Sequence, residues 1–313
     1  MMDDGKGDGG YGTVRDEDLL FENNLVYKLP NPVSVAVSRT HKTRHAQRRE
    51  YAENQTVSFD LNSGTDFIDW SNSYLFVDVT VTGGPAWTAG WGSGSAVNLF
   101  RNIRIFHRSG TELANAQYIN HWSRNNTINE KSPSWVNTVG ALAGVNAANF
   151  TNAATRHTYC IPVEMLHPFF KPEGSVMCPA SLASGLRIEL DTELYRQVFT
   201  RTDANDALTG YTINNIYLKT MNVTLMDSAQ ASLNREAQQN ALEYTYKRIF
   251  TNQQPIGAVS TLNVEVRKAC SFAEKAICIL RDGSAAADGV DNFASIAYQP
   301  GSWGFRLGNL RFP

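Results

Sequence analysis

The stretch that decides the fold runs from Asn54 to Val81 and reads NQTVSFDLNSGTDFIDWSNSYLFVDVTV. Two strand patterns flank a polar turn, and the second pattern ends in strict alternation of residue types. A strand with one apolar and one polar face belongs to an antiparallel sheet that has one side in a core and the other in water. Its two faces consist of Leu75, Val77, Val79 and Val81 on one side and of Phe76, Asp78 and Thr80 on the other.

The same strand pattern recurs along the chain and predicts an all-β protein. Long connections rich in glycine and alanine separate the strands at 83–95 and 140–154. Long connections between alternating strands are typical of Greek-key and jelly-roll topologies, in which strands cross from one sheet to the other. The predicted strands are 55–61, 73–82, 97–107, 156–165, 185–191 and 212–226.

One segment has a clear helical pattern and divides the chain. SAQASLNREAQQNALEY follows Asp227, which can cap a helix, and it contains neither glycine nor proline. Strand patterns resume at 244–251, 261–267, 275–281 and 303–311. The predicted organisation is a mobile N-terminal arm (1–30), a first sandwich (31–226), a linker helix (227–243) and a second, short or incomplete sandwich (244–313).

The composition suits a folded globular protein. The 313 residues are 42% hydrophobic and 19% charged, with a net charge of −2. No apolar run approaches the ~20 residues that span a bilayer, and the acidic, glycine-rich N-terminus is not expected to be a signal peptide. Four cysteines without metal-type spacing predict free thiols in a reducing intracellular compartment. They are Cys160, Cys178, Cys270 and Cys278.

No motif predicts a catalytic, cofactor or metal site. The six histidines lack the spacing that a metal-binding cupin needs, and neither a G-x-S-x-G elbow nor a Walker-type phosphate loop occurs. Asp66 and Asp69 lie in a polar turn, where their side chains are expected to accept hydrogen bonds from backbone amides. We therefore expect a protein that is not an enzyme and that has no cofactor.

Several blocks of the sequence resemble a known family. They are DFIDWSNSYLFVDVTV (66–81), VNLFRNIRIFHRSGTELANA (97–116) and IPVEMLHPFFKPEGSVMCPASLASGLRIELDTE (161–193). In order and spacing they resemble the first jelly roll of double-jelly-roll major capsid proteins of polinton-like and adintovirus-like DNA viruses. The family patterns are IDL-x-x-x-YL, NNLF-x-x-I-x-V and LPFF…LPSGLRIEL. EYTYKRIFTNQQ (243–254) resembles the opening of the family's second jelly roll, so the likeness covers 48–312 in scattered blocks.

The resemblance implies a viral capsid protein that self-assembles into trimeric, pseudo-hexagonal capsomers of an icosahedral shell and resides in the virion. It implies neighbouring capsomers and penton or minor capsid proteins as partners. The chain departs from the family in length, because only 86 residues follow Asp227. The second jelly roll is therefore expected to be compact or to be completed by another chain, and to contribute more inter-subunit contact per residue than residues 50–226. Truncation at residue 227 is expected to abolish oligomers and to leave a folded first sandwich.

A basic segment is the first candidate contact surface. It consists of Arg39, Lys42, Arg44, Arg48 and Arg49. These side chains could contact packaged nucleic acid or an inner membrane through their phosphates. The alternative is a solvated strand edge or a contact with a neighbouring subunit.

The loop MLHPFFKPEG (165–174) is the second candidate surface. Two adjacent phenylalanines in a loop between strands are not expected to face one core together, so Phe169 or Phe170 could anchor a neighbouring subunit. The alternative is that both rings fold into their own sandwich.

Two other functions remain open. A minor or penton-type capsid protein with a single jelly roll would share the first sandwich. A cellular carbohydrate-binding β-sandwich would use aromatic side chains, for which Trp87, Trp91 and Trp122 are available.

Overall fold

The computed structural model describes most of the first two thirds of the chain and short parts of the rest. The described residues are 36–83, 88–92, 94–151, 155–201, 208–239, 243–253, 266, 273–279, 305–307 and 310–312. The predicted N-terminal arm lies outside them, as does the predicted strand 261–267 apart from Val266.

The described elements are mostly strands. The strands are β1 (Ala36–His45), β2 (Thr56–Asp60), β3 (Phe67–Gly83), β4 (Thr88–Gly90), β5 (Phe100–Phe106), β6 (Glu112–Gln117), β7 (Phe150–Thr151), β8 (Arg156–Pro162), β9 (Arg187–Thr192), β10 (Thr200–Arg201), β11 (Leu208–Leu225), β12 (Phe305–Leu307) and β13 (Leu310–Phe312). The α-helices are α2 (Ile119–Glu130), α3 (Pro133–Trp135), α4 (Ala180–Ala183), α5 (Tyr195–Val198) and α6 (Asp227–Gln239). Short 3₁₀ and π turns are η1 (Ala96–Leu99), η2 (Val136–Gly140), η3 (Val163–Met165), η4 (Pro168–Phe170) and η5 (Glu173–Ser175).

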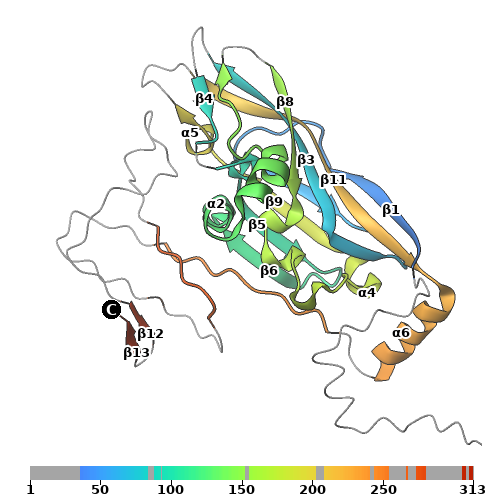
Figure 1. The fold of residues 1–313 in the computed structure, drawn as a ribbon. Coiled ribbons are helices and arrows are strands. Elements are labelled where there is room, and N and C mark those ends of the chain that lie inside the picture. Colours follow the sequence, from blue (N-terminus) through green and yellow to red (C-terminus); the bar gives the residue numbers. More distant parts are fainter. Residues whose placement is uncertain are drawn as a thin grey trace, which may run out of the picture.

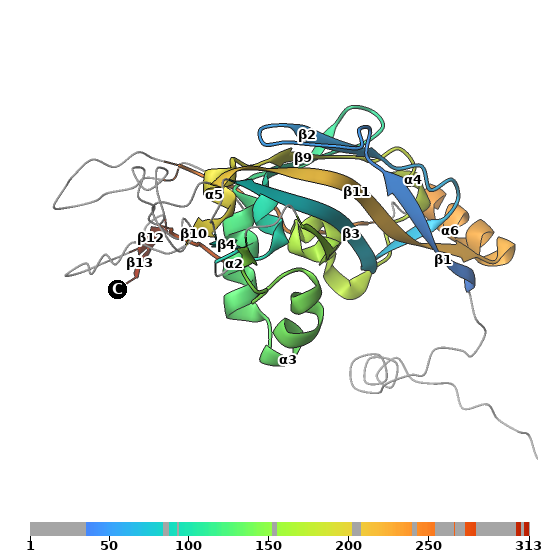
Figure 2. The same cartoon turned by 90° about the horizontal axis from the view of Figure 1, so that it is seen from above.

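Two four-stranded antiparallel sheets form the body of the protein (Figures 1 and 2). The first has the order β1-β11-β3-β8, and the second has the order β2-β9-β5-β6. A small sheet, β10-β4-β7, is not hydrogen-bonded to these two but packs against β8, where Phe150 of β7 contacts Tyr159. Helix α6 follows β11 and projects beyond the end of the sheet, while α2 and α3 lie to one side of the body.

The strand order identifies a jelly roll. Among the eight strands of the two large sheets, the first pairs with the last, β1 with β11. The second pairs with the seventh, β2 with β9; the third with the sixth, β3 with β8; and the fourth with the fifth, β5 with β6. The chain is thus one long antiparallel hairpin, rolled so that successive strands mostly alternate between two sheets. The predicted all-β jelly-roll sandwich is confirmed.

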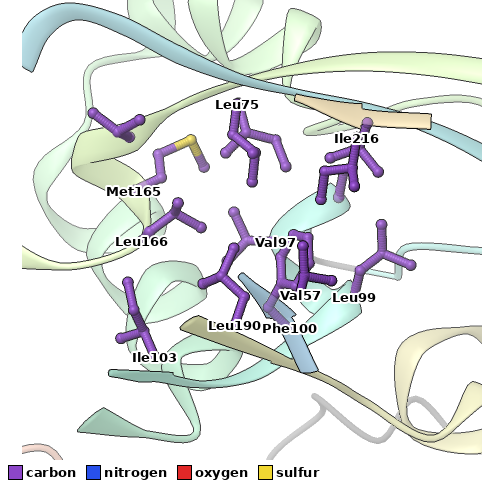
Figure 3. Packing of buried hydrophobic residues seen from close by; sticks show 14 of the residues in the cluster. Val57, Leu75, Val97, Leu99, Phe100, Ile103, Met165, Leu166, Leu190 and Ile216 are labelled. Atoms are coloured by element: carbon purple, nitrogen blue, oxygen red, sulfur yellow. The ribbon is translucent and has the colours of Figure 1, made fainter. Parts of the chain in front are cut away.

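The core lies between the two large sheets, as the alternation predicted. Leu75, Val77 and Val79 of β3 are at most 1% exposed, and Phe76 and Thr80 on the other face are half-buried. Figure 3 shows how side chains from both sheets meet. The labelled residues are Val57, Leu75, Val97, Leu99, Phe100, Ile103, Met165, Leu166, Leu190 and Ile216.

The six strands predicted before residue 227 are observed, with shifted ends. The segment predicted as 97–107 opens with the 3₁₀ turn η1, which Ser95 caps by accepting a hydrogen bond from the Val97 amide. β3 begins six residues earlier than the predicted 73, because it continues through DWSNS beside a register shift in β11. The strand predicted to reach residue 165 ends at Pro162, where the 3₁₀ turn η3 begins.

Strand β6 and helix α2 are among the elements that were not predicted. Strand β6 reads ELANAQ and lacks the β-branched and aromatic residues that favour strands. Helix α2 reads INHWSRNNTINE and is rich in residues of low helix propensity, so the expectation of a single helix was wrong. Burial of Ile119, His121 and Thr127 shows that tertiary packing overrides propensity in α2.

After residue 226 the outcome is mixed. The predicted helix is observed and begins at Asp227. The strand predicted at 244–251 is wrong, because this described segment pairs with no sheet. The described part of the strand predicted at 275–281 carries no strand either. Within 303–311, the structure has the short hairpin β12–β13.

Candidate interaction surfaces

The basic segment lies on the edge strand β1 and on the turn that follows it. Lys42 and Arg44 are tied to their own subunit: Lys42 Nζ donates to Asp66 Oδ2 at 2.6 Å, and Arg44 donates to the Asn62 carbonyl at 2.7 Å. Arg39, Arg48 and Arg49 are exposed. Of the five predicted residues, these three remain as an outward-facing cationic group, which we call the basic edge.

Asp66 joins β1 to β11, a role that the sequence analysis did not predict. Besides the Lys42 ammonium, its carboxylate accepts hydrogen bonds from Asn222 at 3.3 Å and from Thr224 at 2.9 Å. Burial raises the pKa of Asp66, but these three hydrogen bonds outweigh it and hold the pKa below its usual value. The charged carboxylate of Asp66 thus has a structural role, because it links β1 to β11. The hydrogen bond from a backbone amide that was expected of both aspartates is found at Asp69, which accepts it from the Ser71 amide at 3.0 Å.

Phe169 and Phe170 both lie in the core of their own subunit. Phe169 is 0% exposed and Phe170 is 1% exposed. They occupy the 3₁₀ turn η4, where successive side chains point about a third of a turn apart rather than to opposite faces. Both rings therefore reach one core, and the inter-subunit anchor proposed for them is wrong.

The aromatic rings around η4 form a cluster. Trp70 of β3 contacts Phe170 edge-on, with ring centroids 4.9 Å apart. Tyr244 and Tyr246, from beyond helix α6, contact Phe169 at 5.3 and 4.9 Å. The loop predicted to face a neighbour is thus covered by a later segment of the same chain.

His167 fixes the turn that carries the two phenylalanines. Its Nδ1 accepts a hydrogen bond from the Phe169 amide at 2.9 Å, and the side chain is 1% exposed. Burial, with a smaller effect from the nearby charge of Arg248, lowers the pKa of His167 from 6.5 to about 4. The folded protein therefore holds this imidazole in its neutral form.

We expect His167 to make the protein acid-sensitive. As the pH falls below 6.5, His167 of the unfolded chain binds a proton, whereas His167 of the folded protein binds it only near pH 4. The free energy of unfolding should therefore fall by up to about 1.4 kcal/mol per pH unit across this window. His167→Asn keeps an acceptor for the Phe169 amide and does not titrate, so urea unfolding of this variant should lose that slope. The exposed-site variant His41→Asn should keep it; equal slopes in both variants would contradict the assignment.

Residues 243–253, which we call the strap, lie along the body of the sandwich. Tyr244 Oη donates to the Phe169 carbonyl at 2.6 Å, and Tyr246 Oη donates to the Leu113 carbonyl at 2.7 Å. Tyr244 and Tyr246 are half-buried, whereas Glu243, Thr245 and Lys247 are exposed. This alternation predicted a strand. The inward side chains of the strap instead contact aromatic rings and backbone carbonyls, and its backbone joins no sheet.

The outer face of the first sheet carries a row of side chains across all four strands. His45, Tyr217, Phe76 and Cys160 lie opposite one another in register. Phe76 and Tyr217 stack with centroids 4.9 Å apart. Beside the row, Asp78 is bound by Arg156 and Thr158, and these hydrogen bonds outweigh burial and lower its pKa.

The aromatic residues proposed for a sugar site are not gathered on a surface. Trp91 is 2% exposed, and Trp122 is half-buried in α2; Trp87 lies outside the described residues. Within the part of the chain that the structure describes, no group of histidine, cysteine and carboxylate side chains could hold a metal ion. In the same residues, no helix is long and apolar enough to cross a membrane.

Comparison with solved structures returns viral capsid proteins. The chain is 13% identical to the quasi-atomic model of the PBCV-1 virus capsid, with a TM-score of 0.48, over 66% of this chain and 46% of that one. It is 11% identical to the Faustovirus major capsid protein, with a TM-score of 0.45, over 67% and 58%. For the STIV MCP the identity is 12% and the TM-score 0.36, over 63% and 51%. No protein-family model and no curated protein matches the sequence.

These similarities are partial. The chain spans about half the length of the solved structures that it matches. The jelly-roll assignment rests on the strand pairing of this chain itself.

Proposed function

We propose that this chain is a structural subunit of a viral capsid and catalyses no reaction. The observation that carries the proposal is the jelly-roll strand order, β1-β11-β3-β8 facing β2-β9-β5-β6, a fold that capsid proteins share with lectins and cupins. The sequence resemblance at 66–81, 97–116 and 161–193 favours capsid proteins among these classes. The buried position of Trp91 argues against the sugar-binding alternative.

The proposed assembly is a trimer with a pseudo-hexagonal outline, in which each chain supplies two similar sides. Closed symmetric association lets one protein tile a flat shell face. Neighbouring capsomers, and penton or minor capsid proteins, are the proposed partners, and the virion is the proposed location after synthesis in a reducing compartment of the host. Completion of the second sandwich by another chain remains part of the proposal.

The test is native mass spectrometry of the purified chain, followed by negative-stain imaging. We expect a species of three times the 34.7 kDa chain mass, with a three-fold or six-fold outline. A protein that stays monomeric at every concentration and binds glycans would overturn the proposal in favour of a carbohydrate-binding module.

A minor or penton-type capsid protein is the second candidate, because the described residues contain one complete jelly roll. After α6 the described residues are the strap, Val266, residues 273–279 and the hairpin β12–β13. A five-fold assembly in the same native mass measurement would favour this candidate over the trimer.

We further propose that the basic edge contacts phosphates of packaged nucleic acid or of an inner membrane. Replacing Arg39, Arg48 and Arg49 by glutamine should weaken binding to duplex DNA, because each cation that neutralises a phosphate releases a counterion. We expect the slope of log affinity against log salt to become shallower by roughly 2–3. Fluorescence anisotropy over a salt series measures it, and anionic vesicles test the membrane alternative.

The matched control places the same charge change elsewhere. Glutamine at Arg101, Arg187 and Arg196 alters the net charge equally but leaves the basic edge intact. If both triple variants shift the salt slope alike, the basic edge has no specific role.

A further inference from the structure

Each of the two large sheets has two edge strands: β1 and β8 in the first, β2 and β6 in the second. An unguarded edge exposes unpaired backbone groups and recruits other strands, so proteins protect edges with charges, prolines, short strands or covering segments. Strand β1 carries the cations Arg39 and Arg44, β8 ends at Pro162, and β2 has five residues and ends at Asp60. Three of the four edges thus have protection of their own.

Strand β6 has the weakest protection of its own. Its sequence ELANAQ contains no lysine, arginine or proline, and its one charged residue, Glu112, is the first. A register shift beside Glu112 disturbs only that end of its pairing with β5. The remainder, Ala114–Gln117, is a regular strand with nothing in its own sequence to discourage a partner.

The strap covers this edge. Tyr246 Oη donates to the Leu113 carbonyl at 2.7 Å, and Thr251 Oγ1 donates to the Gln117 carbonyl at 2.9 Å. Just beyond β6, Tyr118 Oη donates to Gln253 Oε1 at 2.6 Å. The strap therefore contacts the edge near both ends of β6.

The covering contacts come from side-chain hydroxyls and not from a backbone ladder. Residues 243–253 form no strand. Among the described residues, their one main-chain hydrogen bond to the body joins the Glu173 amide to the Thr245 carbonyl at 3.0 Å. A hydroxyl satisfies a carbonyl without adding a strand, so the sheet ends at β6 and no new edge is created. The ring contacts of Tyr244 and Tyr246 with Phe169 fix the strap in place.

We propose that the strap guards the β6 edge, and that its release exposes β6 to antiparallel pairing with β6 of a second copy. The chemistry of the edge favours this partner, because two antiparallel copies of ELANAQ bring only one carboxylate each and place it at opposite ends of the pair. The proposal concerns the subunit itself and does not depend on the capsid function.

The test removes the two hydroxyls from the full chain with the double variant Tyr246→Phe, Thr251→Val, which keeps the ring and the side-chain volume. We expect amide hydrogen exchange of residues 112–117 to rise roughly tenfold or more at low protein concentration. Exchange of the same residues should slow again as the concentration rises, because β6 then pairs between copies. Sedimentation velocity should show the matching self-association.

The control is Thr245→Val, which removes a hydroxyl that donates to Glu243 within the strap itself. This variant should behave like the wild type, and Thr251→Val alone should give a weaker form of the double variant's effect. Unchanged exchange at 112–117 in the double variant would overturn the guarding role. Faster exchange that does not slow with concentration would overturn pairing through β6.

Discussion

Replacing Trp91 by alanine should lower the free energy of unfolding by roughly 3–5 kcal/mol, among the largest effects expected of any single substitution in this chain. Trp91 follows β4 and is 2% exposed. Its ring stacks on Phe199 at 5.1 Å and contacts Phe150 and Tyr159 edge-on at 5.2 and 5.3 Å. Removing the indole leaves a cavity among three rings that come from separate parts of the chain, so the site cannot collapse easily.

The packing around Trp91 leaves little room for adjustment. Gly144 has a φ of +86°, and a Cβ there would lie 2.9 Å from Tyr159 Cε1 and 3.0 Å from Trp91 Nε1.

Urea unfolding at neutral pH measures the loss of stability in Trp91→Ala. The matched control is Trp135→Ala, because this ring, at the end of α3, is only half-buried and lies beside Lys131. Equal losses in the two variants would contradict a central role for the Trp91 cluster.

The jelly roll was predictable because its longest strands obey one simple period. In β3, apolar residues recur at every second position from Leu75 to Val81, and all four are at most 1% exposed. Burial also alternates along β11, although a register shift between Ile213 and Asn215 moves the buried positions from odd to even numbers. Strand β6 was not predicted because the sequence ELANAQ does not favour a strand; it forms one because it pairs with β5. Helix α2 escaped for the same kind of reason, since burial of Ile119 and its neighbours outweighs poor helix propensity.

The contact surfaces were less predictable than the fold because they depend on partners far away in sequence. The basic residues were visible, but the use of Lys42 inside the subunit depends on Asp66, 24 residues further on. The burial of Phe169 and Phe170 depends on a 3₁₀ turn that His167 caps, and no periodic pattern signals such a turn. At 244–251 buried and exposed side chains do alternate. The segment forms no strand, because its inward side chains pack on the Phe169 ring and on the edge of β6.

Ending the chain after Met226 should destabilise the first sandwich, and ending it after Gln253 should not. The strap begins beyond Met226, so the shorter chain loses Tyr244 and Tyr246, whose rings contact Phe169. Burial of a large apolar side chain stabilises by roughly 1.5–3 kcal/mol, and half-buried tyrosines contribute part of that. With their hydrogen bonds, we expect the shorter chain to lose roughly 2–4 kcal/mol.

This result would replace the expectation that a chain truncated at residue 227 leaves an intact first sandwich. The strap follows the helix in sequence but packs on the sandwich that precedes it, so the first folded unit extends to residue 253. Thermal unfolding and solubility of the two truncated chains measure the difference. Equal stability of both would show that the strap adds nothing to the sandwich.

The position of this boundary also decides how assembly should be tested. A chain ending after Met226 loses the strap and exposes the β6 edge, so any change in its oligomeric state mixes two causes. A chain ending after Gln253 keeps the edge covered and removes only the residues beyond the strap. If residues 254–313 supply the contacts between subunits, this chain should stay folded and become monomeric in native mass spectrometry. If it still forms the full-length oligomer, those contacts lie within residues 1–253.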